Sequence, residues 1–348
     1  MVDLAKAVSS NEQIAAAFPQ GLVAVFVGGT SGVGQYTLAA LAKIAPPNTR
    51  VYMVGRSRAA AEKIINECAS ANCAITFLQG NISELKEVDN VCRQIQAKET
   101  AVNLLVQSQG STDFASFTSE GLYLPLSLAL HSRIRFVVNL LPLLQRATCV
   151  RRVVSIFAGT TEGPVDFDDF AGQRKSMVDR RDHLASCMTL AFCKIQADAP
   201  TVSFVHTNPG VVPTQIHRDA KGMIKVLFGI SNFLGPLLFH TPPATSGQMH
   251  LFFATSARYA PRKSSTAGAA AAGGPYGGVP LPDGVVVSRG VLGEEGGGVY
   301  SLSPVGESLP PKKEELMRRL RDDGAMDRVW SILMTDYKRI AAGKETSV

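Results

Sequence analysis

The chain has 348 residues, of which 45% are hydrophobic and 18% are charged. This balance excludes the disordered, collagen-like and coiled-coil classes, and the length allows one large domain or two small ones. The net charge of +6, from 35 basic and 29 acidic side chains, is spread along the chain without a run of one sign. We therefore expect a solvated basic surface and no nucleic-acid partner.

The six cysteines contain no Cys-x-x-Cys pair, so the sequence predicts no metal site and no thioredoxin-like motif. We expect reduced thiols in a cytoplasmic protein. Residues 1–20 carry acidic side chains and lack the apolar core of a secretory signal, and a short helix is expected there. The most apolar stretch, 223–240, contains Lys225 and Pro236 and is too short and too interrupted to be assigned as a transmembrane span.

From residue 21 onward, apolar runs alternate with helical patterns. The first run, 22–27, lies between glycines, which is typical of a strand buried on both faces of a parallel sheet. Strict alternation predicts an α/β fold: a Rossmann-like, doubly wound parallel sheet in one domain over 21–263. Further strands are expected at 51–54, 73–78, 102–106, 150–157 and 201–206, and helices at 33–44, 59–69, 83–97, 122–144 and 178–196.

The amino-acid composition changes from residue 264 onward. Residues 264–298 are rich in glycine and alanine and offer few groups able to pack, so a flexible surface insertion is expected. A last strand is predicted at 299–302 and an amphipathic helix at 312–342, which together form a C-terminal extension within 299–348.

Directly after the first strand the chain reads Gly-Gly-Thr-Ser-Gly-Val-Gly and enters a helix. Glycine permits the positive φ of a tight turn and lets the backbone approach a pyrophosphate, which the first amides of the helix then face. A structural glycine turn is the alternative, but a strand-to-helix junction at the start of an alternating fold is the context of a dinucleotide loop. The residues expected to hold the cofactor here are Gly28, Thr30, Ser31, Gly32, Val33 and Gly34.

The end of the second strand indicates which nicotinamide nucleotide is used. An acid there binds the ribose 2′-hydroxyl, whereas an arginine accepts a 2′-phosphate. Here the strand is followed by Arg56 and Ser57, and the first acid is Glu62. These residues favour NADP(H), with a solvated arginine at the start of a helix as the alternative.

These residues resemble the short-chain dehydrogenase/reductase family from about 23 to 214, because the family's Gly-x-x-x-Gly-x-Gly pattern matches Gly28, Gly32 and Gly34. The resemblance implies an adenine contact at Asn81 and a nicotinamide amide contact at Thr214. The segments 132–136 and 299–302 look like those of divergent reductases of fungal secondary metabolism. Further cofactor contacts implied by the resemblance are Ile82, Gln109, Gly110, Pro209, Gly210 and Val212.

The residues that carry the family's chemistry are missing. The family uses a Ser, and a Tyr and Lys four residues apart on one helix; the Lys lowers the pKa of the Tyr, which donates the proton. None of the seven tyrosines lies between the fifth and sixth strands, and the Tyr and Lys positions hold Lys175 and Asp179. The string from Tyr259 to Lys263 follows the sixth strand and contains Pro261, which breaks the helix that this spacing needs.

Three side chains are candidates for the proton chemistry. Lys175 acts as a general acid if burial lowers its pKa, with a solvated surface lysine as the alternative. Thr160 can donate a hydrogen bond to a substrate carbonyl or serve only in a turn. His131, near the position of the family's helix Asn, can donate a proton near neutral pH or be a structural histidine.

Two functions of different class remain open. The first is an NADPH-dependent oxidoreductase acting on a bulky apolar small molecule, because residues 211–240 are rich in Leu, Ile, Phe and Met and are expected to cover the crevice as a lid. An oligomer face and a membrane-surface contact are the alternatives for this segment. The second function is a non-redox isomerase, cyclase or nucleotide-binding protein on the same fold. The resemblance also implies a possible homo-oligomer.

Overall fold

The computed structural model describes residues 2–70, 72–214, 241–262 and 277–343. In these residues seven strands form one sheet in the order β3-β2-β1-β4-β5-β6-β7, and every neighbouring pair is parallel. The predicted Rossmann-like, doubly wound α/β fold is therefore confirmed. The strands are β1 (Val23–Val27), β2 (Thr49–Gly55), β3 (Cys73–Gln79), β4 (Leu104–Gln107), β5 (Arg152–Ile156), β6 (Ser203–Thr207) and β7 (Val299–Leu302).

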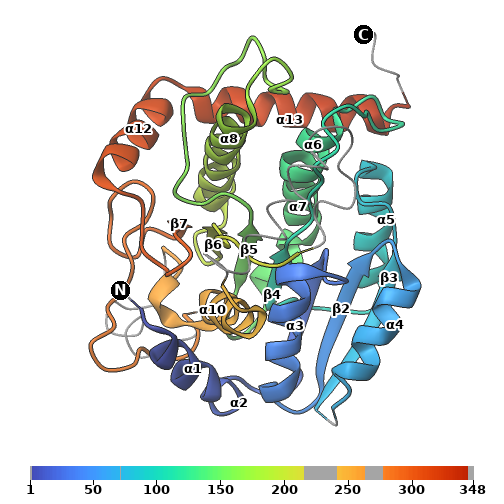
Figure 1. Ribbon diagram of the computed structural model, residues 1–348, viewed down its shortest axis with the longest axis vertical. Helices are drawn as coiled ribbons and strands as arrows, with labels where there is room; N and C mark the ends of the chain where they lie inside the picture. The colour runs from blue at the N-terminus through green and yellow to red at the C-terminus, as the bar shows by residue number, and fades with distance from the viewer. Residues whose placement is uncertain (1, 71, 215–240, 263–276, 344–348) are drawn as a thin grey trace.

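Helices cover both faces of the sheet, which explains why the central strands are apolar without alternation (Figure 1). One apolar cluster joins the sheet to α5 (Leu85–Gln96), α7 (Ser132–Arg146) and α8 (Met177–Asp198). A second cluster on the other face joins it to α3 (Gly32–Ile44), α4 (Arg58–Glu67) and α10 (Pro243–Thr255). β3 lies at the sheet edge and mixes buried with exposed residues, as an edge strand should.

Helix α10 has no counterpart among the predicted elements. Its residues from Met249 to Thr255 are all buried, so the segment shows no contrast between an apolar and a polar face. Such a helix has almost no amphipathic periodicity and cannot be recognised by it. It packs against α3 so closely that a Cβ on Gly247 would stand 2.5 Å from the carbonyl oxygen of Tyr36.

Three predicted helices are divided. The N-terminal helix is α1 (Leu4–Glu12) followed by α2 (Ile14–Ala17). The helix expected at 122–144 consists of α6 (Leu124–Leu126), a π-helical turn η1 (Ser127–His131) and α7. The C-terminal helix is α12 (Pro311–Asp322) and α13 (Ala325–Ala341), separated by Gly324 in the left-handed conformation at φ 75°. Glycine adopts this conformation without steric cost and so ends one helix and begins the next. Helix α13 lies across α8 and α5 (Figure 1).

Two predicted segments fall partly outside the described residues. Of the expected lid at 211–240, only 211–214 is described. Of the expected surface insertion at 264–298, residues 277–298 are described, and they are anchored rather than loose. Val279 is fully buried and forms a bridge to Ser256, and Val291 is 2% exposed. None of the helices in the described parts of the chain is long and apolar enough to cross a membrane.

Candidate functional site

The glycine loop connects β1 to α3 at the point where the strand order reverses, since β1 lies between β2 and β4. Gly28 and Gly32 have φ of 81° and 60°, which side chains rarely tolerate. A Cβ on Gly34 would stand 2.3 Å from Oγ of Ser108. Ser31 precedes α3, but its side chain makes no capping hydrogen bond to the first amides of α3. The loop therefore fits a pyrophosphate at an uncapped helix N-terminus.

The loop residues contact two other loops of the sheet. A Cβ on Gly28 would stand 2.8 Å from the amide nitrogen of Gln109, which follows β4, and one on Gly32 would stand 3.0 Å from Cγ2 of Thr214, which follows β6. The loop also approaches the end of β2, since a Cβ on Gly55 would stand 2.7 Å from Cγ2 of Thr30. Val33, in contrast, is 6% exposed and belongs to the apolar cluster under α3, so it can offer a ligand only its backbone.

Arg56 and Ser57 follow β2, as predicted. Both are exposed, and the carbonyl oxygen of Arg56 accepts a hydrogen bond of 3.1 Å from Gln79. Ser57 caps α4 by accepting the amide hydrogen of Ala60 at 3.2 Å, which leaves its hydroxyl hydrogen available as a donor. Arg58 lies with its guanidinium 5.6 Å from the Phe77 ring centre and adds a second basic side chain at this end of the sheet.

The next contacts implied by the family lie after β3 and β4. Asn81 is exposed and its side-chain oxygen accepts a 2.9 Å hydrogen bond from Ser83, whereas Ile82 is 5% exposed in the core. Gln109 is 5% exposed, and its Oε1 has no hydrogen-bond partner among the described residues. Gly110 beside it is exposed. A buried, unpartnered amide oxygen beside the glycine loop fits a donor group of a ligand, such as a ribose hydroxyl.

The segment after β6 also reaches the glycine loop. Gly210 has a φ of 70°, and its amide donates to Oδ1 of Asn208 at 2.9 Å. The next residues turn back toward α3, where the Tyr36 hydroxyl donates to the carbonyl oxygen of Pro213 at 2.8 Å. The site therefore gathers residues from the loops after β1, β2, β3, β4 and β6 at one edge of the sheet. From the β6 loop these are Pro209, Gly210, Val212 and Thr214.

Thr160 lies after β5 in a strained conformation. Its φ is 67°, which a β-branched residue rarely adopts, at a cost of about 1–2 kcal/mol. Its amide donates to the hydroxyl oxygen of Ser301 in β7 at 2.7 Å, and its own hydroxyl donates to the carbonyl oxygen of Gly159 at 2.6 Å. The hydroxyl of Thr160 therefore has a local acceptor already, and a substrate would have to compete with it.

Lys175 does not stand as an isolated base. Its Nζ lies 2.9 Å from Oδ2 of Asp166, and its side chain is 20% exposed. The hydrogen bond from Lys175 lowers the pKa of Asp166, so the acid is charged at neutral pH and forms an ion pair with the lysine. This geometry favours the alternative given above, in which Lys175 is a surface lysine, here held in an ion pair with Asp166.

His131 contacts the C-terminal helix α13. It is fully buried, its Nε2 lies 2.9 Å from Oδ2 of Asp336 in α13, and its carbonyl oxygen accepts a hydrogen bond from Tyr337. These contacts favour the alternative of a structural histidine that links the π-helical turn η1 to α13, and the role of proton donor stays a prediction. Tyr259, in the unsuitable Tyr-x-x-x-Lys string, is also fully buried and donates to the carbonyl oxygen of Gly306.

A buried polar cluster near Thr160 had no counterpart in the sequence interpretation. Glu162, Thr189 and His206 are all fully buried. His206 accepts the amide hydrogen of Ala158 on Nε2 at 3.1 Å, so its other nitrogen carries a proton and faces Oγ1 of Thr189 at 3.0 Å. The Thr189 hydroxyl donates to Oε1 of Glu162 at 2.8 Å. Burial alone would raise the pKa of Glu162, but the nearby His206, whose Nδ1 lies 3.6 Å from Oε1, lowers it. The sequence signal that could have indicated this cluster is a histidine within the strand predicted at 201–206.

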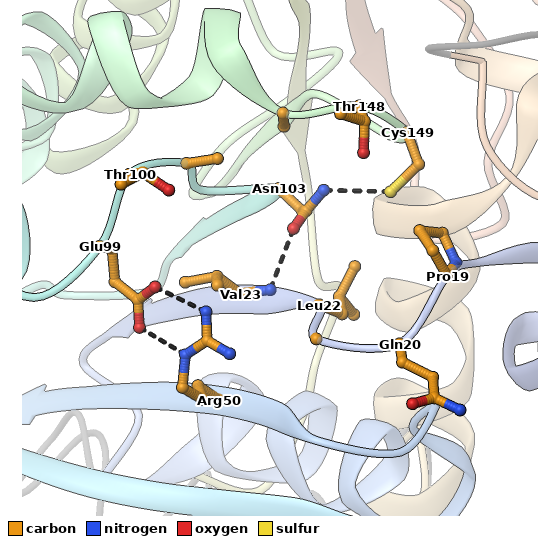
Figure 2. A pocket seen from close by; sticks show the side chains of 13 residues that line it. Pro19, Gln20, Leu22, Val23, Arg50, Glu99, Thr100, Asn103, Thr148 and Cys149 are labelled. Carbon is orange, nitrogen blue, oxygen red and sulfur yellow. Dashed lines mark hydrogen bonds and ion pairs between the residues drawn. The ribbon is translucent and has the colours of Figure 1, made fainter.

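A cavity of about 160 Å³ lies at the opposite, amino-terminal edge of the sheet (Figure 2). Arg50 donates to both carboxylate oxygens of Glu99 at 2.7 Å. Oδ1 of Asn103 accepts a 3.0 Å hydrogen bond from the Val23 amide, and Nδ2 of Asn103 donates to the Cys149 sulfur at 3.0 Å. Burial raises the pKa of Cys149 to about 11, so this thiol is not a nucleophile at neutral pH. The polar groups here bind one another, and parallel sheets bind ligands at the other edge.

Comparison with known proteins agrees with this geometry. A family model for short chain dehydrogenases matches residues 22–162. Oxidoreductase AN1596 of Emericella nidulans is 31% identical over 338 residues, which cover 95% of this chain and 96% of that protein. Oxidoreductase andH of Emericella variicolor is 31% identical over 330 residues, which cover 93% and 94%. The resemblance to the family is thereby confirmed: the chain belongs to the short-chain dehydrogenase/reductase family of oxidoreductases.

A solved structure shows the same fold at lower identity. The 3-oxoacyl-(acyl-carrier-protein) reductase from Agrobacterium tumefaciens C58, with NADP bound, has a TM-score of 0.52 and 19% identity, covering 72% of this chain and 91% of that one. Within the described parts of this chain, no group of three or more His, Cys, Asp or Glu side chains is arranged to hold a metal ion.

Proposed function

We propose that this protein is an NADPH-dependent oxidoreductase that acts on a bulky apolar small molecule, an intermediate of secondary metabolism. The observation that carries the proposal is the exposed Arg56 at the carboxyl end of β2, beside an uncapped glycine-loop helix. An acid at that position would select the 2′-hydroxyl of NADH, whereas an arginine binds the 2′-phosphate of NADPH. When bound, the nucleotide supplies the hydride, and the protein supplies binding and orientation.

The residues that would hold the nucleotide are distributed along the carboxyl edge of the sheet. The first amides of α3 would bind the pyrophosphate, and Arg56 with the Ser57 hydroxyl would bind the 2′-phosphate. Asn81 would contact the adenine, and Thr214, beside Gly32, would contact the nicotinamide amide. The NADP named for the Agrobacterium reductase is consistent with this choice of nucleotide.

Exposed apolar side chains support an apolar substrate. Phe117 follows β4, Met177 and Val178 begin α8 after β5, and Val211 follows β6. Their exposed fractions are 56%, 47%, 56% and 54%. Large apolar side chains exposed in the loops at the carboxyl edge are expected where an apolar ligand binds. The apolar segment 215–240, from which this substrate class was first inferred, lies outside the described residues.

A non-redox function on the same fold is the second candidate. It is favoured by the pairing of Lys175 with Asp166 and by the burial of His131, which leave the usual proton-handling positions without a free acid. In that case the protein would bind the nucleotide or use the apolar pocket as a template without hydride transfer.

The nucleotide assignment is tested by titrating the purified protein with NADPH and NADH and following the fluorescence of the reduced nicotinamide. We expect tighter binding of NADPH and loss of most of that preference in Arg56→Ala. The control is Arg93→Ala, which removes a positive charge from an exposed position of α5. Equal affinities for the two nucleotides in the parent protein contradict the assignment.

The two classes are separated by incubation with candidate pathway intermediates, with and without NADPH, while the absorbance of the reduced nicotinamide is recorded. Consumption of NADPH in step with product supports hydride transfer. Product that forms without any consumption supports the non-redox function. Full activity of Lys175→Ala in the same assay removes this residue as the proton donor.

A further inference from the structure

Arg133, in the second residue position of α7, is a buried cation at the carboxyl end of the sheet. Its side chain is 1% exposed. Nη1 donates to the carbonyl oxygen of Gln107 at 3.0 Å and to Oγ of Ser155 at 2.6 Å, and Nη2 donates to the carbonyl oxygen of Ile156 at 3.1 Å. The guanidinium therefore joins the last residues of β4 and β5.

The charge of Arg133 has no acidic partner in the described parts of the chain. All of its hydrogen-bond acceptors there are neutral: the carbonyl oxygens named above, those of Leu128 and Gln109, and one hydroxyl. The ring of Phe157 lies 5.7 Å from the guanidinium carbon. Burial lowers the pKa of Arg133 to about 9, so the group still carries its positive charge at neutral pH. An uncompensated charge in a low-dielectric interior acts over a longer range than one in water.

Gln109 lies between the guanidinium of Arg133 and the glycine loop. Arg133 holds the carbonyl oxygen of Gln109, whose amide nitrogen stands 2.8 Å from where a Cβ of Gly28 would lie. One residue therefore separates the guanidinium from the dinucleotide loop. In a doubly wound sheet the adenosine half binds over the first three strands and the other half binds across the switch point, over the fourth and fifth. Arg133 lies at the ends of those two strands.

We infer that Arg133 makes the site bind the reduced nicotinamide nucleotide more tightly than the oxidised one, so that NADPH readily displaces NADP⁺ after hydride transfer. This inference rests on the proposed function. The oxidised nicotinamide ring carries a positive charge and the reduced ring is neutral, so a buried cation behind the site raises the energy of the oxidised form alone. As an order of magnitude, two unit charges about 10 Å apart at an effective dielectric constant of about 20 interact by an amount that corresponds to about tenfold in the ratio of dissociation constants.

Arg152 provides a matched control within the same sheet. It is also fully buried, and among the described residues it donates only to carbonyl oxygens, those of Phe253, Ser256 and Gly277. Burial lowers its pKa as well, to about 10. It begins β5, at the amino edge, whereas Arg133 contacts the end of β5. The two arginines therefore have similar environments at opposite ends of one strand.

The test is to measure the dissociation constants of NADP⁺ and NADPH by calorimetry for the parent protein, Arg133→Met, Arg133→Lys and Arg152→Met. We expect the NADP⁺/NADPH ratio to fall about tenfold in Arg133→Met and to be retained in Arg133→Lys, which keeps the charge, and in Arg152→Met. An unchanged ratio in Arg133→Met overturns the inference. A fall of similar size in Arg133→Lys or Arg152→Met also overturns it, because the effect would then come from lost packing.

The parent protein alone keeps the inference falsifiable if Arg133→Met does not fold. Parent protein that binds NADP⁺ as tightly as NADPH overturns it, and tighter binding of NADPH with retention of the ratio in Arg133→Lys supports it. Failure of the proposed function is a separate result: the parent protein then binds neither nucleotide, and no ratio exists.

Discussion

Nε2 of His131 lies 2.9 Å from Oδ2 of Asp336, although the two residues are 205 positions apart in the chain. The Tyr337 hydroxyl adds a hydrogen bond of 2.8 Å to the carbonyl oxygen of His131. These contacts tie α13 to the π-helical turn that precedes α7. The C-terminal helix is thus held by a specific polar contact as well as by its apolar face.

Asp336→Ala is expected to lower the free energy of unfolding by about 2 kcal/mol, because the buried His131 ring nitrogen loses its partner. Urea denaturation measures this change. The control is Asp327→Ala in the same helix, whose carboxylate is 67% exposed and pairs with Lys194, and which should cost less than about 1 kcal/mol. Equal losses in the two variants would show that the His131 contact contributes nothing specific.

Acid stability should depend on Glu99 at the amino edge of the sheet. Burial alone would raise the pKa of this carboxyl, but hydrogen bonds from Arg50 and Tyr52 hold it below its ordinary value of 4.5. The unfolded chain therefore binds more protons between the two pKa values, so the stabilisation is complete above about pH 4.5 and is lost as the pH falls through the lower, folded value.

We expect Glu99→Gln to be less stable than the parent protein at neutral pH and to lose less stability between pH 5 and pH 3. Thermal unfolding across this range measures the difference. Glu12→Gln, at an exposed position of α1, controls for the loss of one carboxylate. Parallel curves for the parent protein and Glu99→Gln would contradict the prediction.

Gly34→Ala should weaken nucleotide binding by tenfold or more. The new Cβ would stand 2.3 Å from Oγ of Ser108 and 3.0 Å from the carbonyl oxygen of Gly28, so the loop must shift. The first amides of α3 would then no longer point at the pyrophosphate. Titration with NADPH measures the loss.

Gly284→Ala is the matched control for Gly34→Ala. Gly284 has a φ of 72° and only Lys6 near its would-be Cβ, at 3.6 Å. Its replacement should cost about 1 kcal/mol of stability through backbone strain and leave NADPH affinity unchanged. If both variants bind NADPH like the parent protein, the glycine loop is not the nucleotide site.

The strained turn at Thr160 should depend on Ser301. Ser301→Ala removes the acceptor of the Thr160 amide and should lower the free energy of unfolding by about 1–2 kcal/mol. Thr160→Gly should be tolerated, because glycine adopts a φ of 67° without strain and this gain offsets the added flexibility of the unfolded chain. Chemical denaturation compares the two variants, and a larger loss in Thr160→Gly would contradict the argument.

Most of the fold could be predicted from local sequence patterns. The two features that the patterns did not predict, helix α10 and the break at Gly324, share a cause. The strands were found because a strand covered on both faces is an apolar run bounded by glycine, as at 22–27. Helix α10 was missed because it is buried all round and has no polar face to set the period. The break at Gly324 was missed because the pattern on both sides of it is amphipathic and only the backbone angle separates the two helices.

The residues proposed to bind the cofactor and those proposed for the proton chemistry also differ in how far local sequence predicts them. The glycine loop and Arg56 are local features, since they depend on backbone freedom and on a position at the end of a strand, and both can be read from neighbouring residues. The roles of His131, Lys175 and Thr160 depend on side-chain partners from other segments, and those of His131 and Thr160 are more than a hundred residues away. His131 pairs with Asp336, Lys175 with Asp166 and Thr160 with Ser301. Arg133 received no role at all until its carbonyl partners were known.

Periodicity therefore predicted the sheet and its two helical layers, and the glycine motif predicted a dinucleotide loop, because both features depend on residues adjacent in the chain. The partners of the buried charged groups came only from tertiary packing. A charge can be buried only when donors and acceptors from separate elements meet around it, and the sequence of one element does not contain the other.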